Sequence, residues 1–119
     1  MRFLLVALVG IGVGIGHAAS VEAAGWAKLE GSYAITARNY LDPGAEERKD
    51  SHLRIQLQGS AARDLYRAMR SRDVVDECTK GLTRRQGEMR CTRHIQPERY
   101  SCDFAIDLAR QRIEYGLAC

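Results

Sequence analysis

The sequence predicts a small single α+β domain, with an antiparallel sheet of four or five strands and one helix packed on one face of that sheet. Three observations lead to this fold class. Residues 52–58 alternate apolar and polar side chains, which is typical of a half-buried strand. After Gly59 the apolar residues recur at helical spacing as far as Met69, and Ser60 stands where a helix-capping hydroxyl is expected. No repeat, low-complexity run or linker divides the chain.

Further alternating segments supply the rest of the expected sheet. Residues 29–38 predict a first strand before the central unit. Residues 85–92 and 99–108 predict a hairpin that carries Cys91 and Cys102 on its inward faces.

The segment 108–115 is ambiguous. It fits a short helix, but it also fits a tight turn into a last edge strand. We favour the strand because Ile113 and Tyr115 alternate around Glu114.

Residues 1–23 are typical of a signal peptide. Arg2 gives a positive start, and residues 3–15 form an apolar run that is broken only by glycines. Small residues follow, so cleavage is expected after Ala18 or Ala23, which leaves residues 24–119 as the mature domain. The run is shorter than the ~20 residues that a membrane span needs, and stable membrane insertion is not expected. We therefore expect a periplasmic or secreted protein, assuming a Gram-negative envelope.

Four cysteines lie between residues 78 and 119. An even number of cysteines in an exported protein predicts disulfides, and two are expected here. The preferred pairing is Cys78 with Cys91 and Cys102 with Cys119, because each bond would tie a flexible flank to a strand. A bond between Cys91 and Cys102 across the hairpin is the open alternative. Zinc is not favoured because Cys91 and His94 lack a second paired ligand motif, so neither a metal nor a cofactor is expected.

The composition argues against nucleic-acid binding and against catalysis. A net charge of +3 is weak, and there is no signature of an RNA-binding or DNA-binding fold. Beyond the signal peptide the histidines are His52 and His94, and neither lies in a recognisable catalytic motif. Asp50, Ser51 and His52 are adjacent, but neighbouring side chains of an extended chain point apart. We do not expect an enzyme.

Two charged segments are the candidate binding surfaces. Residues 39–51 combine an Asp-Pro-Gly turn with a cluster of charges, which predicts a long exposed loop between two strands. Loops on rigid scaffolds often carry recognition. The second surface is the basic hairpin, which spans residues 84–93. The candidate partner-binding residues are Tyr40, Asp42, Glu46, Glu47, Arg48 and Lys49 in the loop, and Arg84, Arg85, Arg90 and Arg93 in the hairpin.

These observations suit a small exported protein that binds another protein. By elimination, we expect an inhibitor or immunity protein that blocks an envelope-acting enzyme or toxin, such as a lysozyme-like wall hydrolase. We expect it to be a monomer or a small homo-oligomer. This expectation rests on compartment and fold class and not on a motif. An accessory structural or wall-binding subunit of an envelope machine is the second hypothesis, and a small enzyme is the third.

Overall fold

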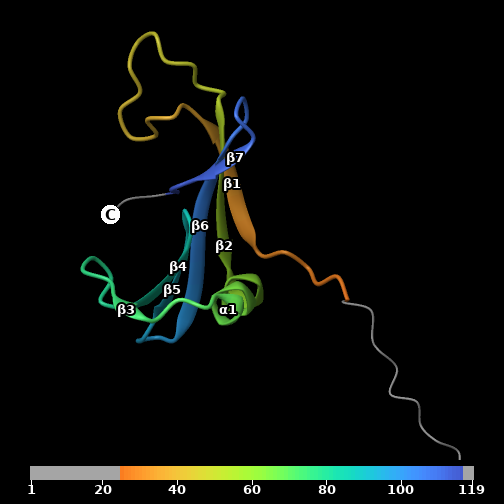
Figure 1. Cartoon of the computed structure of the whole chain (residues 1–119), viewed down its shortest axis with the longest axis vertical. Coiled ribbons are helices and arrows are strands. Elements are labelled where there is room, and N and C mark those ends of the chain that lie inside the picture. The colour runs from red at the N-terminus through yellow and green to blue at the C-terminus, as the bar shows by residue number, and fades with distance from the viewer. Residues whose placement is uncertain (1–24, 117–119) are drawn as a thin grey trace, which may run out of the picture.

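The computed structural model describes residues 25–116, which form one antiparallel sheet with one helix packed against it (Figure 1). The α+β class is therefore confirmed. The predicted signal peptide and Cys119 lie outside the described residues. The elements are β1 (Gly31–Thr36), β2 (His52–Gln58), α1 (Gly59–Ala68), β3 (Val74–Val75), β4 (Leu82–Gln86), β5 (Met89–His94), β6 (Arg99–Asp107) and β7 (Arg112–Glu114).

The described sheet has seven strands, which is more than the four or five expected. The strands that were not predicted separately are β3 and β4. β3 has two residues, which is too short to show an alternating pattern. β4 was not separated from β5, because the segment expected as one strand over residues 85–92 contains the turn between them. The strand favoured for the segment 108–115 is present as β7.

The nine-residue strand β6 is the centre of the sheet. The strand order is β1-β2-β6-β5-β4-β3, and β6 pairs with β2 along one edge. Its other edge is shared, because residues 99–103 pair with β5 and residues 105–107 pair with β7. Gly116 follows β7 and lies so close to β6 that an added Cβ would be 2.6 Å from the backbone nitrogen of Phe104. A glycine is needed for this close approach.

Helix α1 begins two residues earlier than the sequence indicates. Gln58 is the N-cap, and its side chain makes no capping hydrogen bond. Ser60 therefore lies in the first turn, and its hydroxyl donates to Glu30 Oε1 at 3.3 Å. The prediction that Ser60 caps the helix is wrong. Gly59 makes the turn from strand to helix, since its φ of 59° lies in the left-handed region that favours glycine.

One end of the sheet carries the core. Directly opposite residues in an antiparallel sheet share a face, so Leu57, Cys102 and Cys91 form one row across β2, β6 and β5. The helix covers this row. The buried cluster consists of Ala62, Tyr66, Met69, Cys91 and Cys102, with Leu57, Leu65, Met89 and Tyr100 packed around it.

The other end of the same face is not covered by any element among residues 25–116. Tyr33 is 76% exposed and Ile35 is 50% exposed, and the apolar side chains beside them on β2 and β6 are only half-buried. We call this surface the open apolar face. Its residues are Tyr33, Ile35, Leu53, Ile55, Phe104 and Ile106.

The disulfide in the described structure joins Cys91 and Cys102, which corrects the preferred pairing. These residues face each other directly across β5 and β6, with their Cα atoms 4.0 Å apart. A bond between Cys78 and Cys91 is therefore excluded, and so is one between Cys102 and Cys119. Cys78 is also disulfide-bonded, and no cysteine of the described residues is free. Two disulfides were expected, and the one whose partners both lie within the described residues is the alternative pairing, Cys91–Cys102.

Candidate functional site

The β1–β2 loop (residues 37–51) projects from the end of the sheet that lies away from α1 (Figure 1). Glu47 organises this loop from inside. Its carboxylate accepts hydrogen bonds from the backbone amides of Asn39 at 2.7 Å and Gly44 at 3.1 Å. The amide of Glu47 in turn donates to the carbonyl of Gly44 at 3.0 Å. One acidic side chain thus closes the loop on itself and preorganises its backbone.

The outer part of the loop carries its most exposed large apolar side chain, Leu41. Leu41 is 84% exposed, and Tyr40 beside it is 46% exposed. Asp42, Glu46 and Lys49 are also exposed. Leu41 was not among the predicted binding residues, although a single aliphatic residue within a run of charges is a usable signal.

Two charged residues of the loop are engaged with each other. Arg48 donates to Asp50 at 3.1 Å, and both side chains are largely exposed. The hydrogen bond from Arg48 lowers the pKa of Asp50. An exposed pair of this kind contributes little to stability and can exchange its partner on binding.

Arg54 on β2 holds the base of the loop in place. Its guanidinium donates to Thr36 Oγ1 at 3.0 Å and to the carbonyl of Arg38 at 2.8 Å. A further hydrogen bond runs to the carbonyl of Gly116. The same guanidinium lies 5.1 Å from the centroid of the Tyr40 ring. The alternating pattern indicates only that Arg54 lies on the polar side of a strand, and its positioning role was not predicted.

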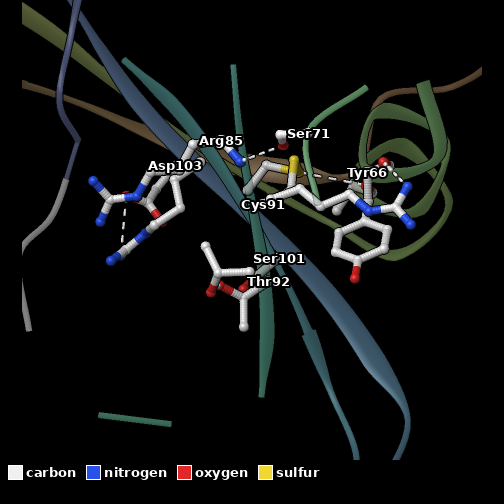
Figure 2. Close-up of a disulfide and its surroundings, with 12 residues drawn as sticks. Tyr66, Ser71, Arg85, Cys91, Thr92, Ser101 and Asp103 are labelled. Carbon is white, nitrogen blue, oxygen red and sulfur yellow. Dashed lines mark hydrogen bonds and ion pairs between the residues drawn. A yellow bond between two sulfur atoms is a disulfide. The ribbon is translucent and has the colours of Figure 1, made fainter. Parts of the chain in front are cut away.

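The four arginines of the basic hairpin do not form one surface. The register of β4 and β5 places Arg84 and Arg93 on the helix-bearing face and Arg85 and Arg90 on the opposite, polar face. Figure 2 shows these two environments, with Tyr66 and Asp103 on opposite sides of the strands around Cys91.

On the helix-bearing face the arginines have acidic partners. Arg84 donates to Asp73 at 2.7 Å, and its guanidinium lies 4.4 Å from the centroid of the Tyr66 ring. Tyr66 donates to the same carboxylate at 2.5 Å. Hydrogen bonds from Tyr66 and Arg84 lower the pKa of Asp73, whereas burial raises the pKa of Tyr66 to about 12. Arg93 pairs with Glu98 at 2.9 Å.

The arginines of the polar face are also engaged. Arg90 lies 3.1 Å from Asp103 and donates to the Tyr115 hydroxyl at 2.8 Å. Arg85 donates to the same hydroxyl at 3.2 Å. The side chain of Arg90 is only 12% exposed. Arg84, Arg90 and Arg93 are each neutralised by a carboxylate of the fold, so the hairpin presents less positive charge than its sequence suggests.

A polar groove of about 620 Å³ lies on the polar face of β2, β6 and β5. Within it His94 Nε2 lies 3.0 Å from Ser101 Oγ. Burial lowers the pKa of His94, and the charge of Arg99 lowers it further. No carboxylate of the described residues is hydrogen-bonded to the His94 ring, so the orienting third member of a catalytic triad is not supplied. Gln56, Gln58, Asp76, Thr92 and Asp103 also line the groove.

The described residues contain one group whose side chains converge as metal ligands would, namely His52, Asp107 and Glu114. His52 Nε2 lies 3.1 Å from Glu114 and 3.9 Å from Asp107. Arg112 lies 3.6 Å from Glu114, and Arg110 lies 3.9 Å from Asp107. Protein cations thus already balance both carboxylates, and the cluster is best explained as a structural link between β2, β6 and β7.

Ser51 extends this link. Its Oγ lies 2.8 Å from His52 Nδ1, which corrects the expectation that these neighbours point apart. The contact is possible because the strand begins at His52 and Ser51 lies in the bend before it. A chain of serine, histidine and glutamate has the composition of a hydrolase triad. However, His52 is only 4% exposed, which leaves little room for a substrate.

Comparison with protein-family models, curated proteins and solved structures finds no match to this chain. Within residues 25–116, no helix is long and apolar enough to cross a membrane. The function is therefore inferred from the geometry of the site itself.

Proposed function

We propose that this chain is a small exported binding protein that acts as an inhibitor or immunity protein. Its target is an envelope-acting enzyme or toxin, such as a lysozyme-like wall hydrolase, and the β1–β2 loop enters the target's cleft. The observation that carries the proposal is a loop closed by Glu47 that leaves Leu41 84% exposed. A preorganised loop loses little conformational entropy on binding, which favours affinity.

The chemistry of the loop indicates what the target cleft offers. Leu41 is an apolar anchor, and Tyr40 adds a flat, partly exposed ring. The loop also carries four carboxylates against Arg48 and Lys49 within residues 39–51. It therefore suits a cleft with an apolar floor and a basic rim, and the opposite charges would accelerate the encounter. The carboxylates are those of Asp42, Glu46, Glu47 and Asp50.

The basic hairpin is the weaker candidate surface. Arg84, Arg90 and Arg93 already pair with carboxylates of the same chain, and binding a partner would require those pairs to open. The Cys91–Cys102 disulfide supports an oxidising compartment and therefore export.

A second candidate function is an accessory subunit of an envelope machine. The open apolar face favours it, because a large uncovered apolar surface is typical of a protein that assembles with others. Such a subunit would keep its partner when the loop is altered, which separates the two candidates. Catalysis is not proposed, because neither His52 nor His94 is part of an accessible and complete catalytic set.

The test uses the mature oxidised protein, immobilised and exposed to an envelope extract. Leu41→Asp places a charge at the proposed anchor, and Ile95→Asp is the matched control because Ile95 is 52% exposed in the turn between β5 and β6. We expect a hydrolase or toxin to be captured by the wild type and by the control, but not by Leu41→Asp. If Leu41→Asp retains its fold and captures the same protein equally well, the loop is not the binding surface.

A further inference from the structure

Strand β1 is an open edge that lacks the usual protections against pairing with another chain. In the described sheet it pairs with β2 alone. Its six residues, GSYAIT, include no charged residue and no proline. Natural edge strands are normally guarded by charges, proline, bulges or very short length. The strand at the far end of the order, β3, is short in this way, since it has two residues. The open edge of β1 can therefore form backbone hydrogen bonds with a further strand.

The backbone groups that face the open edge can be identified from the hydrogen bonds on the other side. The carbonyl of Glu30 accepts from Gln58, and that of Thr36 accepts from Ser51, so both point toward β2. Backbone groups alternate in direction along a strand. Consequently the odd-numbered residues of β1 direct their N–H and C=O groups outward. These residues are Gly31, Tyr33 and Ile35.

We propose that β1 pairs antiparallel with β1 of a second copy of this chain, about a two-fold axis at Ala34. Opposite residues must share a face for the two sheets to continue into one, so odd-numbered residues pair with odd-numbered residues. Centring the pair on Ala34 sets Tyr33 of each copy opposite Ile35 of the other. Aromatic and β-branched residues form favourable cross-strand pairs. Two largely exposed apolar side chains in each copy would then be shielded.

The charges that flank β1 select the same register. Centring on Ala34 brings Glu30 opposite Arg38 of the second copy, and the symmetry makes this pair twice. Both residues are exposed, and Glu30 would add this ion pair to the hydrogen bond that it accepts from Ser60. A shift of two residues, centred on Tyr33, would set Lys28 against Arg38, which is a repulsive pair. A shift the other way, centred on Ile35, would set Glu30 against Tyr40 and lose the ion pair.

This assembly is closed and leaves the β1–β2 loops accessible. A two-fold pair uses the same edge of both copies, so no open β1 edge remains. The loop follows β1 at the end of the sheet away from α1 (Figure 1), and an antiparallel pair sets the two loops at opposite ends. The inference rests on β1 and its flanks, and it does not depend on the proposed function.

Cross-linking tests the register directly in the mature protein. Ala34 of one copy would face Ala34 of the other as a pair without mutual hydrogen bonds, with Cα atoms ~4.5 Å apart. We expect Ala34→Cys to form a disulfide-linked dimer in oxidising buffer. The control is Ser32→Cys, whose two copies would lie ~14 Å apart along the strands and should not cross-link. Equal cross-linking of both variants, or none in Ala34→Cys, would overturn the proposed register.

Exchanging the charges of Glu30 and Arg38 tests whether the partner is a second copy of this chain, and it adds no cysteine. Sedimentation velocity should show a concentration-dependent dimer of the wild type. Glu30→Arg and Arg38→Glu should each weaken it at least ~5-fold, because two exposed ion pairs become repulsive. The double variant Glu30→Arg/Arg38→Glu should recover to within ~2-fold of the wild type. A wild type that stays monomeric, or that binds a GSYAIT peptide from solution yet never itself, would contradict the proposal. A failure to capture a target enzyme would contradict the proposed function but not the proposed dimer.

Discussion

Tyr66 offers a sharp test of how the helix is held to the sheet. Its hydroxyl donates to Asp73 at 2.5 Å, and its ring is only 4% exposed beneath the guanidinium of Arg84. A hydrogen bond to a charged acceptor contributes about 1.5–3 kcal/mol, and the lower end applies because Asp73 keeps its bond to Arg84. We therefore expect Tyr66→Phe to lower the free energy of unfolding by about 1.5 kcal/mol at pH 8.

The same residue gives a pH dependence with a definite sign. Burial raises the pKa of Tyr66 to about 12, so the folded state favours the protonated hydroxyl. This contribution is complete below the unfolded pKa of about 10 and is lost as the pH rises from there toward 12. A shift of about two pKa units corresponds to at most about 2.7 kcal/mol. The wild type should therefore lose more stability than Tyr66→Phe over this interval.

Urea unfolding of both proteins, followed by circular dichroism at several pH values from 8 to 12, measures this difference. We expect the advantage of the wild type at pH 8 to shrink and then reverse above pH 10. A difference between the two proteins that stays constant from pH 8 to 12 would refute the reasoning. So would a Tyr66→Phe variant as stable as the wild type at pH 8.

Three further predictions address the disulfide, the loop and the polar cluster. The double variant Cys91→Ala/Cys102→Ala should lower the free energy of unfolding by about 3 kcal/mol, because the disulfide constrains the unfolded chain. Urea unfolding measures this loss, and an unchanged free energy would show that the bond imposes no such constraint. Glu47→Gln should speed hydrogen exchange at the backbone amides of Asn39 and Gly44 by about tenfold, because each loses a charged hydrogen bond worth about 1.5 kcal/mol. Unchanged exchange would show that other contacts close the loop. His52→Ala should lower the free energy of unfolding by about 2 kcal/mol and speed hydrogen exchange at the amides of β7. If these amides stay as protected as in the wild type, the contact between His52 and Glu114 does not hold this strand.

The sequence was informative where elements are long. β2, α1 and β6 each span enough residues for the apolar period to be read, and all three were predicted. β3 has only two residues and depends on its pairing with β4, so local pattern could not reveal it. The disulfide pairing also depends on register. Only the alignment of β5 with β6 shows that Cys91 and Cys102 lie directly opposite each other.

The candidate site was predicted in outline but not in detail. The boundaries and exposure of the loop followed from its charges, whereas the roles of Glu47 and Arg54 depend on backbone groups that a sequence does not position. The division of the basic hairpin between two faces was predictable from the sequence. Residues of opposite parity in a strand point to opposite faces, so Arg84 and Arg85 were never able to share one surface. The open edge of β1 follows from the strand order, which local pattern does not give.

The central claim is that the β1–β2 loop blocks a target enzyme. The most direct measurement is an inhibition titration of the captured hydrolase or toxin with the wild type, Leu41→Asp and Ile95→Asp, each checked for native circular dichroism. The wild type and Ile95→Asp should inhibit equally, and Leu41→Asp should be at least ~10-fold weaker, because truncating or charging a buried anchor typically costs more than 1 kcal/mol. Equal inhibition by all three proteins, or a captured enzyme whose activity none of them changes, would contradict the account.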